Sequence, residues 1–164
     1  MENFAFRADE KFEWMVESFK NTVYGIAITH TGNTADAEDV FQEVFSICFD
    51  KNPRFANEEH CKAWLIRTAL NCSRRVSLSS WRKKTVPLDA AENVGFSFAL
   101  PEENLVFDAL KKLPPKYRRV LYLFYFEELP SDEIARTLKL KPGTVRMQLL
   151  RGRELMRNSL KDQL

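Results

Sequence analysis

The sequence predicts an all-α fold: two small helical domains joined by a linker, the second of them a four-helix unit. Apolar residues recur three and four positions apart along most of the chain, the spacing that gives a helix one apolar face. Glycine is scarce, at 5 of 164 residues. The pairs that break helices fall between the periodic segments, at Gly32-Asn33, Asn52-Pro53 and Pro114-Pro115. A chain of this length holds one medium domain or two small ones.

Three helices are expected in the first domain, residues 1–84. The first covers residues 8–31, where large apolar side chains recur at helical spacing, and it closes at Gly32-Asn33. The second covers about 35–49, with acidic residues crowding its first turn, and Asn52-Pro53 ends it. After a loop that contains Phe55, a third helix runs from about Glu58 to Ser80 or beyond and leads into a basic stretch, 81–84.

Residues 85–101 change character, because they show no sustained period and contain Pro87, Gly95 and Pro101. We interpret them as a linker. The second domain, residues 102–164, then begins with a helix at 102–112 and another at 116–126. A short helix, a tight turn and a longer helix follow, which completes the four-helix unit.

The last two helices have the pattern of a helix-turn-helix. Ser131 is expected to cap the first of them, with Asp132 and Glu133 in its first turn. Pro142 stands at or just before the start of the second helix, where its missing N–H costs little. Thr144 is an N-cap or first-turn residue whose hydroxyl, with the helix N-terminus, could meet a phosphate.

The second helix of this pair predicts contact with duplex DNA. Val145, Leu149, Gly152 and Met156 share one side of it, which leaves two arginines and two large apolar residues on the other: Arg146, Met147, Leu150 and Arg151. Arginine reads guanine edges in the major groove, and apolar groups touch the thymine methyl. The alternative is an ordinary helical hairpin with a basic surface. Charge favours DNA binding, because residues 136–157 carry seven Lys or Arg and one acid.

The net charge of +2 conceals a segregation of charge along the chain. Residues 34–50 carry five acids and no base, whereas residues 71–84 carry five bases and no acid. Residues 102–164 carry 13 bases and 9 acids. Two basic regions separated in sequence suggest two nucleic-acid contacts.

Several classes of protein are disfavoured by composition. No apolar run approaches the length of a membrane span, and no signal peptide is recognisable, so we expect a cytoplasmic protein without membrane insertion. The three cysteines form no CxxC pair and predict buried, inert thiols. His60 beside Cys61 is only a weak metal signal, because His30 is the only other histidine. We expect no metal, no cofactor and no catalytic constellation.

Two separate sets of residues resemble one family. Residues 109–125 and 132–153, including Asp132-Glu133-Ile134-Ala135 and Gly143-Thr144-Val145-Arg146, resemble region 4 of bacterial sigma-70 family factors. Residues 35–45 and 63–71, including Ala63-Trp64-Leu65-Ile66-Arg67, resemble region 2. The chain has no room for the regions that lie between these two in larger sigma factors. This layout looks like the extracytoplasmic-function (ECF) group.

For the acidic helix, the resemblance implies binding to the β′ clamp helices of core RNA polymerase. The residues concerned are Asp36, Glu38, Asp39, Val40, Gln42 and Glu43. Acids on one side and valines on the other suit docking on a basic coiled coil. A solvated acidic first turn, stabilised by the helix dipole, is the alternative, and both can hold together.

For the −10 element, the resemblance implies that Phe55 and Asn71 frame a pocket for a flipped-out base. An aromatic ring stacks on a base, and an amide reads its edge. The alternative is that Phe55 is a core residue and Asn71 a packing amide. The basic residues that would hold phosphates are Arg74, Arg75, Arg82, Lys83 and Lys84.

For the −35 element, the resemblance implies contact by the outer face of the last helix. The predicted residues are Thr144, Arg146, Met147, Gln148, Leu150 and Arg151. Many family members carry Ser-Arg where this chain has Met147-Gln148. Glutamine can read adenine whereas methionine cannot donate a hydrogen bond, so the −35 base preference stays open.

The implied function is a sigma factor that binds core RNA polymerase and directs promoter-specific initiation on −35 duplex and melted −10 DNA. Its implied partners are the β′ clamp helices, the β flap, promoter DNA and an anti-sigma factor. The alternative is a stand-alone helix-turn-helix regulator, which would need no single-strand site. Target promoters, inducing signal and any inhibitor are not readable from the sequence.

Overall fold

The computed structural model describes the backbone of residues 8–83 and 105–162 and the side chains of residues 10–77 and 105–162. The described residues form helices joined by turns, which confirms the all-α prediction. The chain divides into two compact units, residues 1–98 and 99–164. The predicted linker, 85–101, lies outside the described residues.

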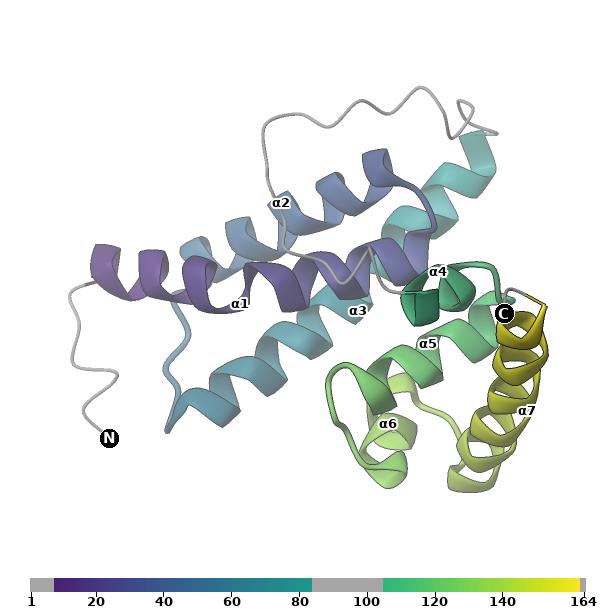
Figure 1. Cartoon of the computed structure of the whole chain (residues 1–164). Coiled ribbons are helices and arrows are strands. Elements are labelled where there is room, and N and C mark those ends of the chain that lie inside the picture. The colour runs from purple at the N-terminus through teal and green to yellow at the C-terminus, as the bar shows by residue number, and fades with distance from the viewer. Residues whose placement is uncertain (1–7, 84–104, 163–164) are drawn as a thin grey trace. The chain divides into compact units, whose positions relative to one another are not determined.

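The first unit contains three helices in the described part: α1 (Ala8–Thr31), α2 (Thr34–Lys51) and α3 (Glu58–Lys83). Each packs against the other two (Figure 1). Their shared core includes Met15, Val23, Val40, Val44 and Leu65, all essentially inaccessible to solvent. The helix limits agree with the sequence-based prediction to within a few residues.

Two of the three predicted helix breaks occur where a residue adopts positive φ. Gly32 has φ 81° and separates α1 from α2. Asn52 adopts the left-handed conformation and ends α2, with its backbone N–H donating to the Cys48 carbonyl. Asn57 begins α3, because its side-chain oxygen accepts from the His60 backbone N–H at 2.8 Å.

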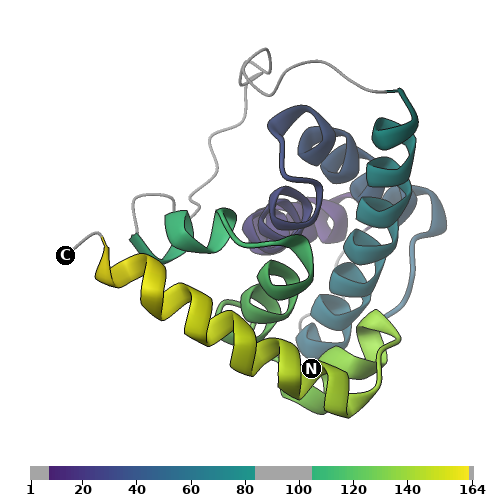
Figure 2. The same ribbon diagram turned by 90° about the vertical axis from the view of Figure 1, so that its right-hand side faces the viewer.

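The second unit contains α4 (Leu105–Lys111), α5 (Pro115–Tyr125), α6 (Ser131–Leu138) and α7 (Pro142–Lys161). Figure 2 shows α7, in yellow, running past α5 and α6; α7 packs against α4, α5 and α6. The core includes Phe107, Leu110, Leu123, Ile134 and Val145. Next to it the Tyr122 hydroxyl donates to Glu127 Oε2 at 3.0 Å, and both side chains are buried.

α7 lies close to α5 because Gly152 has no side chain. A Cβ at this position would lie 2.8 Å from Leu121 Cδ1 and 3.4 Å from Tyr117 Cβ. The absent side chain at Gly152 therefore permits this close approach, and it fixes where α5 crosses α7.

Candidate functional site: an acidic helix, a basic stripe and a helix-turn-helix

The acidic helix α2 begins with a side-chain cap. Asn33 Oδ1 accepts from the Asp36 backbone N–H at 2.8 Å, and Asn33 Nδ2 donates to Asp36 Oδ2, also at 2.8 Å. Asp36 is therefore engaged in holding the first turn, as the dipole interpretation of the acidic residues expects.

The six residues predicted to bind polymerase occupy different environments on α2. Asp39 and Gln42 are exposed, Glu38 is half-buried, and Val40 lies in the core with no exposed surface. Glu43 pairs with Arg75 of α3, with 2.7 Å between Glu43 Oε1 and Arg75 Nη2. The surface that α2 offers to a partner is thus centred on Asp39 and Gln42.

Beside Gln42 lies an aromatic surface that was not predicted from the sequence. Phe49 is 65% exposed, and its ring meets that of Phe12 edge-on with the centroids 5.2 Å apart. A shallow hollow extends from these rings past Phe41, Phe45 and Gln42. Phe49 could have been singled out from the sequence, because it stands seven positions after Gln42 and so shares its face of α2.

Phe55 is packed inside the first unit. Its side chain is 8% exposed, and its ring meets those of His60 and Trp64 at centroid distances of 5.3 and 5.8 Å. Lys11 Nζ lies 5.4 Å from the ring centroid. A base could not stack on this ring in the present arrangement without displacing a neighbour.

α3 carries an exposed polar stripe. Arg67, Asn71 and Arg74 are all exposed and stand four and three positions apart, so they share one face of the helix. Arg67 was quoted in the family motif but not assigned a site, although its spacing from Asn71 places it there. Arg75 is occupied by Glu43 and also donates to Cys72 Sγ at 3.3 Å. The side chains of Trp81, Arg82, Lys83 and Lys84 lie outside the described residues.

The helix-turn-helix is formed by α6, the turn at 139–141 and α7. The predicted cap at Ser131 is wrong: Pro130 is the N-cap, and Ser131 is already helical. The physical reason is that the Pro130 carbonyl accepts the first helical bond, from Ile134 N at 3.0 Å. Lys139 closes α6 in the left-handed conformation, and Pro142 opens α7 as predicted. Lys141 is the N-cap of α7, so Thr144 is a first-turn residue.

The outer face of α7 is open to solvent. Met147 is 58% and Leu150 is 51% exposed, and Thr144, Arg146 and Arg151 are exposed as well. Val145, Leu149 and Gly152 are buried on the opposite face. This is the division of faces that the sequence predicted.

Gln148 departs from this pattern because it is half-buried, with Oε1 inaccessible and without a hydrogen-bond partner. It lines a hollow together with Thr144, Met147 and Arg151 of α7 and with Lys116 and Tyr117 of α5. The sequence places Lys116 and Tyr117 in a helix but in no site, because their approach to α7 depends on the crossing at Gly152.

Arg153 falls within the resemblance to region 4 but was not assigned a site from the sequence. Its Nε donates to the Tyr125 hydroxyl at 2.7 Å, and its guanidinium carbon lies 5.4 and 5.7 Å from the ring centroids of Phe124 and Tyr125. Tyr125 is 53% exposed. The contact joins α7 to the C-terminal end of α5.

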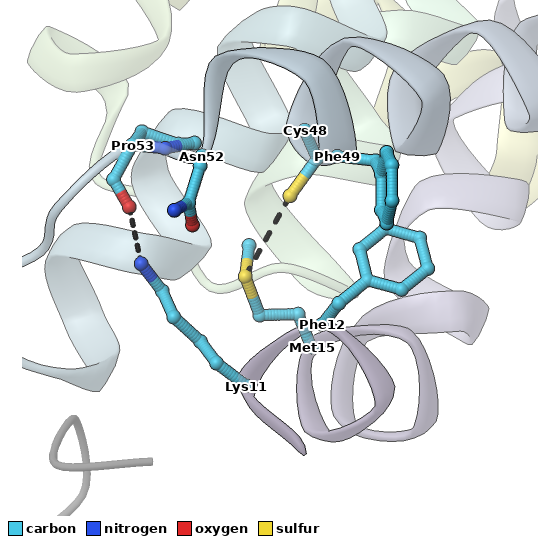
Figure 3. A pocket seen from close by; sticks show the side chains of 7 residues that line it. All are labelled: Lys11, Phe12, Met15, Cys48, Phe49, Asn52 and Pro53. Carbon is cyan, nitrogen blue, oxygen red and sulfur yellow. Dashed lines mark hydrogen bonds between the residues drawn. The ribbon is translucent and has the colours of Figure 1, made fainter. Parts of the chain in front are cut away.

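The cysteine thiols are buried and poorly nucleophilic. Figure 3 shows Cys48 beside Met15 in a small pocket, where Cys48 Sγ donates to Met15 Sδ at 3.6 Å and Lys11 Nζ donates to the Pro53 carbonyl. Burial raises the pKa of Cys48 to about 11 and that of Cys61 to about 12, and it also raises the pKa of Cys72. All three are free and buried, as expected.

His60 makes a hydrogen bond to the loop that precedes α3, and it does not belong to a group of potential metal ligands among the described residues. Its Nδ1 accepts from the Ala56 backbone N–H at 3.1 Å. Within the described residues, no three His, Cys, Asp or Glu side chains are grouped so as to hold a metal ion. Across the same residues, no helix is long and apolar enough to cross a membrane.

The chain combines a helix-turn-helix that has an exposed basic and apolar face with another unit that carries acidic and basic surfaces, and these features are typical of a DNA-binding protein. Residues 15–85 match the family model for sigma-70 region 2, and residues 104–156 match that for sigma-70 region 4. The chain is 30% identical over 173 residues to the ECF RNA polymerase sigma factor SigW of Bacillus subtilis, covering 93% of this chain and 90% of that protein. It is 28% identical to the ECF RNA polymerase sigma-E factor of Haemophilus influenzae, covering 94% and 90%.

Two solved structures have the same fold. The sigma factor RpoE from Bartonella quintana, in a complex with the anti-sigma factor NepR, aligns with TM-score 0.67 at 18% identity over 93% of this chain and 98% of that one. CnrH, in a complex with the cytosolic domain of CnrY, aligns with TM-score 0.63 at 19% identity over 98% and 94%.

This chain belongs to the ECF group of sigma-70 family RNA polymerase sigma factors. It is a promoter-directing subunit of RNA polymerase, and its partners are the core enzyme and promoter DNA. Sigma factors are not enzymes. The match to region 2 disfavours the stand-alone regulator, which would need no such region.

Proposed function

We propose that the two units of this sigma factor divide promoter recognition between them. Residues 1–84 bind core polymerase and the melted −10 strand, residues 102–164 read the −35 duplex, and residues 85–101 join the two. The observation that carries the proposal is the outer face of α7, where two arginines stand beside Met147 and Leu150, both more than half exposed. Large apolar groups on a solvated helix favour burial against a partner, here the floor of the major groove.

In this proposal Asp39, Gln42 and the half-buried Glu38 contact the β′ clamp helices directly. Asp36 holds the first turn of α2 through Asn33, and Val40 anchors the helix to the core. Glu43 acts indirectly, because its ion pair with Arg75 holds α2 against α3. The second unit would contact the β flap.

The −10 strand lies along the exposed stripe of α3. Asn71 reads a base edge, and Arg74 holds a neighbouring phosphate together with Arg75, Arg82 and Lys83. Phe55, buried below His60, forms the floor of the base pocket and is reached when its loop moves.

On the −35 duplex, Arg146 and Arg151 contact guanine edges or phosphates, and Met147 and Leu150 contact thymine methyl groups. Thr144 binds a phosphate from the first turn of α7. Gln148 positions the helix from within the hollow beside Tyr117.

The decisive experiment adds the purified chain to core polymerase with a fragmented genomic library and sequences the transcripts. Transcripts that share paired upstream elements are expected. Core polymerase alone is the control, and a transcript set that does not change when the chain is added would refute the proposal.

The fold neighbours were solved in complexes with an anti-sigma factor and with the cytosolic domain of CnrY, respectively. We propose an anti-sigma partner for this chain too, and a cytoplasmic location beside the polymerase. The chain itself contributes no catalytic group, and nucleotide addition belongs to the core enzyme. A partner that co-purifies with the tagged chain and suppresses its transcripts would support this part; a chain that is recovered with core polymerase alone would count against it.

A further inference from the structure

α5 crosses beneath α7, and its two ends emerge on opposite sides of the DNA-facing surface. The crossing point is fixed by Gly152, against Leu121 and Tyr117. At the N-terminal end of α5, Lys116 and Tyr117 line the hollow beside Thr144, Gln148 and Arg151. At its C-terminal end, Phe124 and Tyr125 contact Arg153.

These contacts fall on the two opposite edges of the exposed face of α7, and Met147 lies between those edges. Thr144, Gln148 and Arg151 stand at intervals of four and three, which puts them along one edge of α7. Arg146, Leu150 and Arg153 have the same intervals and form the other edge. Lys116 therefore flanks one edge, and Arg153 forms part of the other.

Arg153 is oriented before any ligand arrives. Two aromatic faces and the Tyr125 hydroxyl fix its guanidinium, and only Nε–H is used. Among the described residues no acceptor meets its four other N–H groups. An arginine held in this way loses little side-chain entropy on binding, and its fork of donors matches phosphate oxygens.

Lys116 belongs to a basic block on the opposite edge, and it is the lysine of that block that lines the hollow beside α7. Lys111 pairs with Asp108 at 3.6 Å, and Arg118 donates to the Lys111 carbonyl at 3.2 Å. Lys116 is exposed, lies 5.0 Å from the centroid of the Tyr117 ring, and meets no carboxylate within the described part of the chain.

We propose that Lys116 and Arg153 bind phosphates on the two opposite walls of the −35 major groove, so that α5 acts as a crossbar that centres α7 between the strands. The groove is about 12 Å wide, and a helix with its side chains is about 10–12 Å across. Groups at the two edges of a helix in the groove therefore meet the two backbones. The inference rests on the proposed −35 function and adds two contacts that carry no base information.

The test measures retention of promoter DNA by holoenzyme assembled from each variant, at a series of salt concentrations. The probe is a duplex fragment of a promoter recovered in the library experiment, and assembly with core polymerase is verified on native gels. For Lys116→Ala and Arg153→Ala, the slope of log affinity against log salt should fall by about 0.9 each, and by about twice that in the double variant. Affinity should weaken roughly tenfold for each change, by the same factor on every −35 sequence.

Lys112→Ala is the matched control, because it removes an exposed lysine of the same block that does not line the hollow. Its slope should equal that of the wild type. Tyr125→Phe keeps the ring and the charge but removes the acceptor for Arg153, so it should weaken binding by less than Arg153→Ala and leave the slope almost unchanged.

An unchanged slope in either Lys116→Ala or Arg153→Ala overturns the two-walled arrangement, even if the variant melts at a lower temperature. A slope that falls equally in Lys112→Ala also overturns it, because the effect would then be one of general charge. Failure of the proposed function looks different: wild-type holoenzyme would retain no promoter fragment in preference to unrelated DNA.

Discussion

At Gly152 the missing side chain decides how closely two helices approach. The Cβ of an alanine would lie 2.8 Å from Leu121 Cδ1 and 3.1 Å from Leu121 Cγ, and Leu121 is itself buried. Alanine restores about 1 kcal/mol of helix propensity, but overpacking a core costs about 1–3 kcal/mol.

We therefore expect Gly152→Ala to lower the free energy of unfolding by about 1 kcal/mol, measured by urea denaturation followed by circular dichroism. Gly143→Ala is the matched control on the same helix, since its Cβ would meet only Arg146 Nη2, at 3.9 Å. That variant should be as stable as the wild type or slightly more so. Equal losses in both would show that packing on Leu121 is not the cause.

In the native chain, the three thiols should not react with alkylating or disulfide reagents. All are buried, and burial raises the pKa of each, so the reactive thiolate is almost absent at neutral pH. When a chromogenic thiol-specific reagent is added, we expect its absorbance to rise only after denaturant has unfolded the chain. Rapid reaction of any thiol in native buffer would contradict the packing described for Cys48, Cys61 and Cys72.

Among the helices, α2 depends on its cap at Asn33. Asn33→Ala removes the acceptor for the Asp36 backbone N–H and the donor to the Asp36 carboxylate. We expect a loss of about 1 kcal/mol in the free energy of unfolding. Asn33→Ser should recover part of it, because its hydroxyl oxygen restores the acceptor without placing a second charge against Asp36. A variant as stable as the wild type would show that the cap contributes nothing.

Tyr122 should make the second unit sensitive to alkali. Burial, and then the Glu127 carboxylate, raises the pKa of this phenol well above 10.0. The folded chain therefore keeps a proton that the unfolded chain releases above pH 10, so stability is full below that pH and falls as pH rises beyond it. Tyr122→Phe should cost about 1–3 kcal/mol at neutral pH.

Thermal melts of wild type and Tyr122→Phe from pH 7 to 11 would check this. The wild type should lose melting temperature more steeply above pH 10, and the difference between the two chains should shrink. The thiols titrate in both chains and cancel in the comparison. Parallel curves would exclude Tyr122 as the cause.

The helices were predictable from the sequence because periodic apolar residues and the breaks at Gly32, Asn52 and Pro114 act locally. The cap at Ser131 was predicted wrongly for a local reason too: the carbonyl that starts α6 belongs to Pro130. What the sequence could not supply are contacts between distant positions, such as Glu43 with Arg75 or Tyr125 with Arg153. Those depend on how the helices pack, and they change which predicted site residues are open to a partner.

For the whole molecule, the proposed division of labour predicts that substitutions in the two units will separate duplex binding from strand opening. Arg151→Ala removes a charge from the exposed face of α7 and should weaken −35 duplex binding about tenfold. Asn71→Ala removes the amide from the stripe on α3, so it should spare duplex affinity and reduce open-complex formation.

The measurements are holoenzyme retention on duplex promoter DNA and permanganate reactivity of the melted −10 strand. Lys161→Ala, an exposed substitution in the last turn of α7, serves as the control and should change neither. Equal losses of duplex affinity in Asn71→Ala and Arg151→Ala would contradict the division.

Because every native cysteine is buried, introduced cysteines could be labelled selectively for distance measurements by spectroscopy. Cysteines introduced at the exposed Asn21 of the first unit and Asn158 of the second would then be the reactive thiols. A pair of spin labels or dyes at these positions would report the separation of the two units directly. The same labelled molecule could be followed from the free subunit through holoenzyme assembly to promoter engagement, without first removing any natural residue.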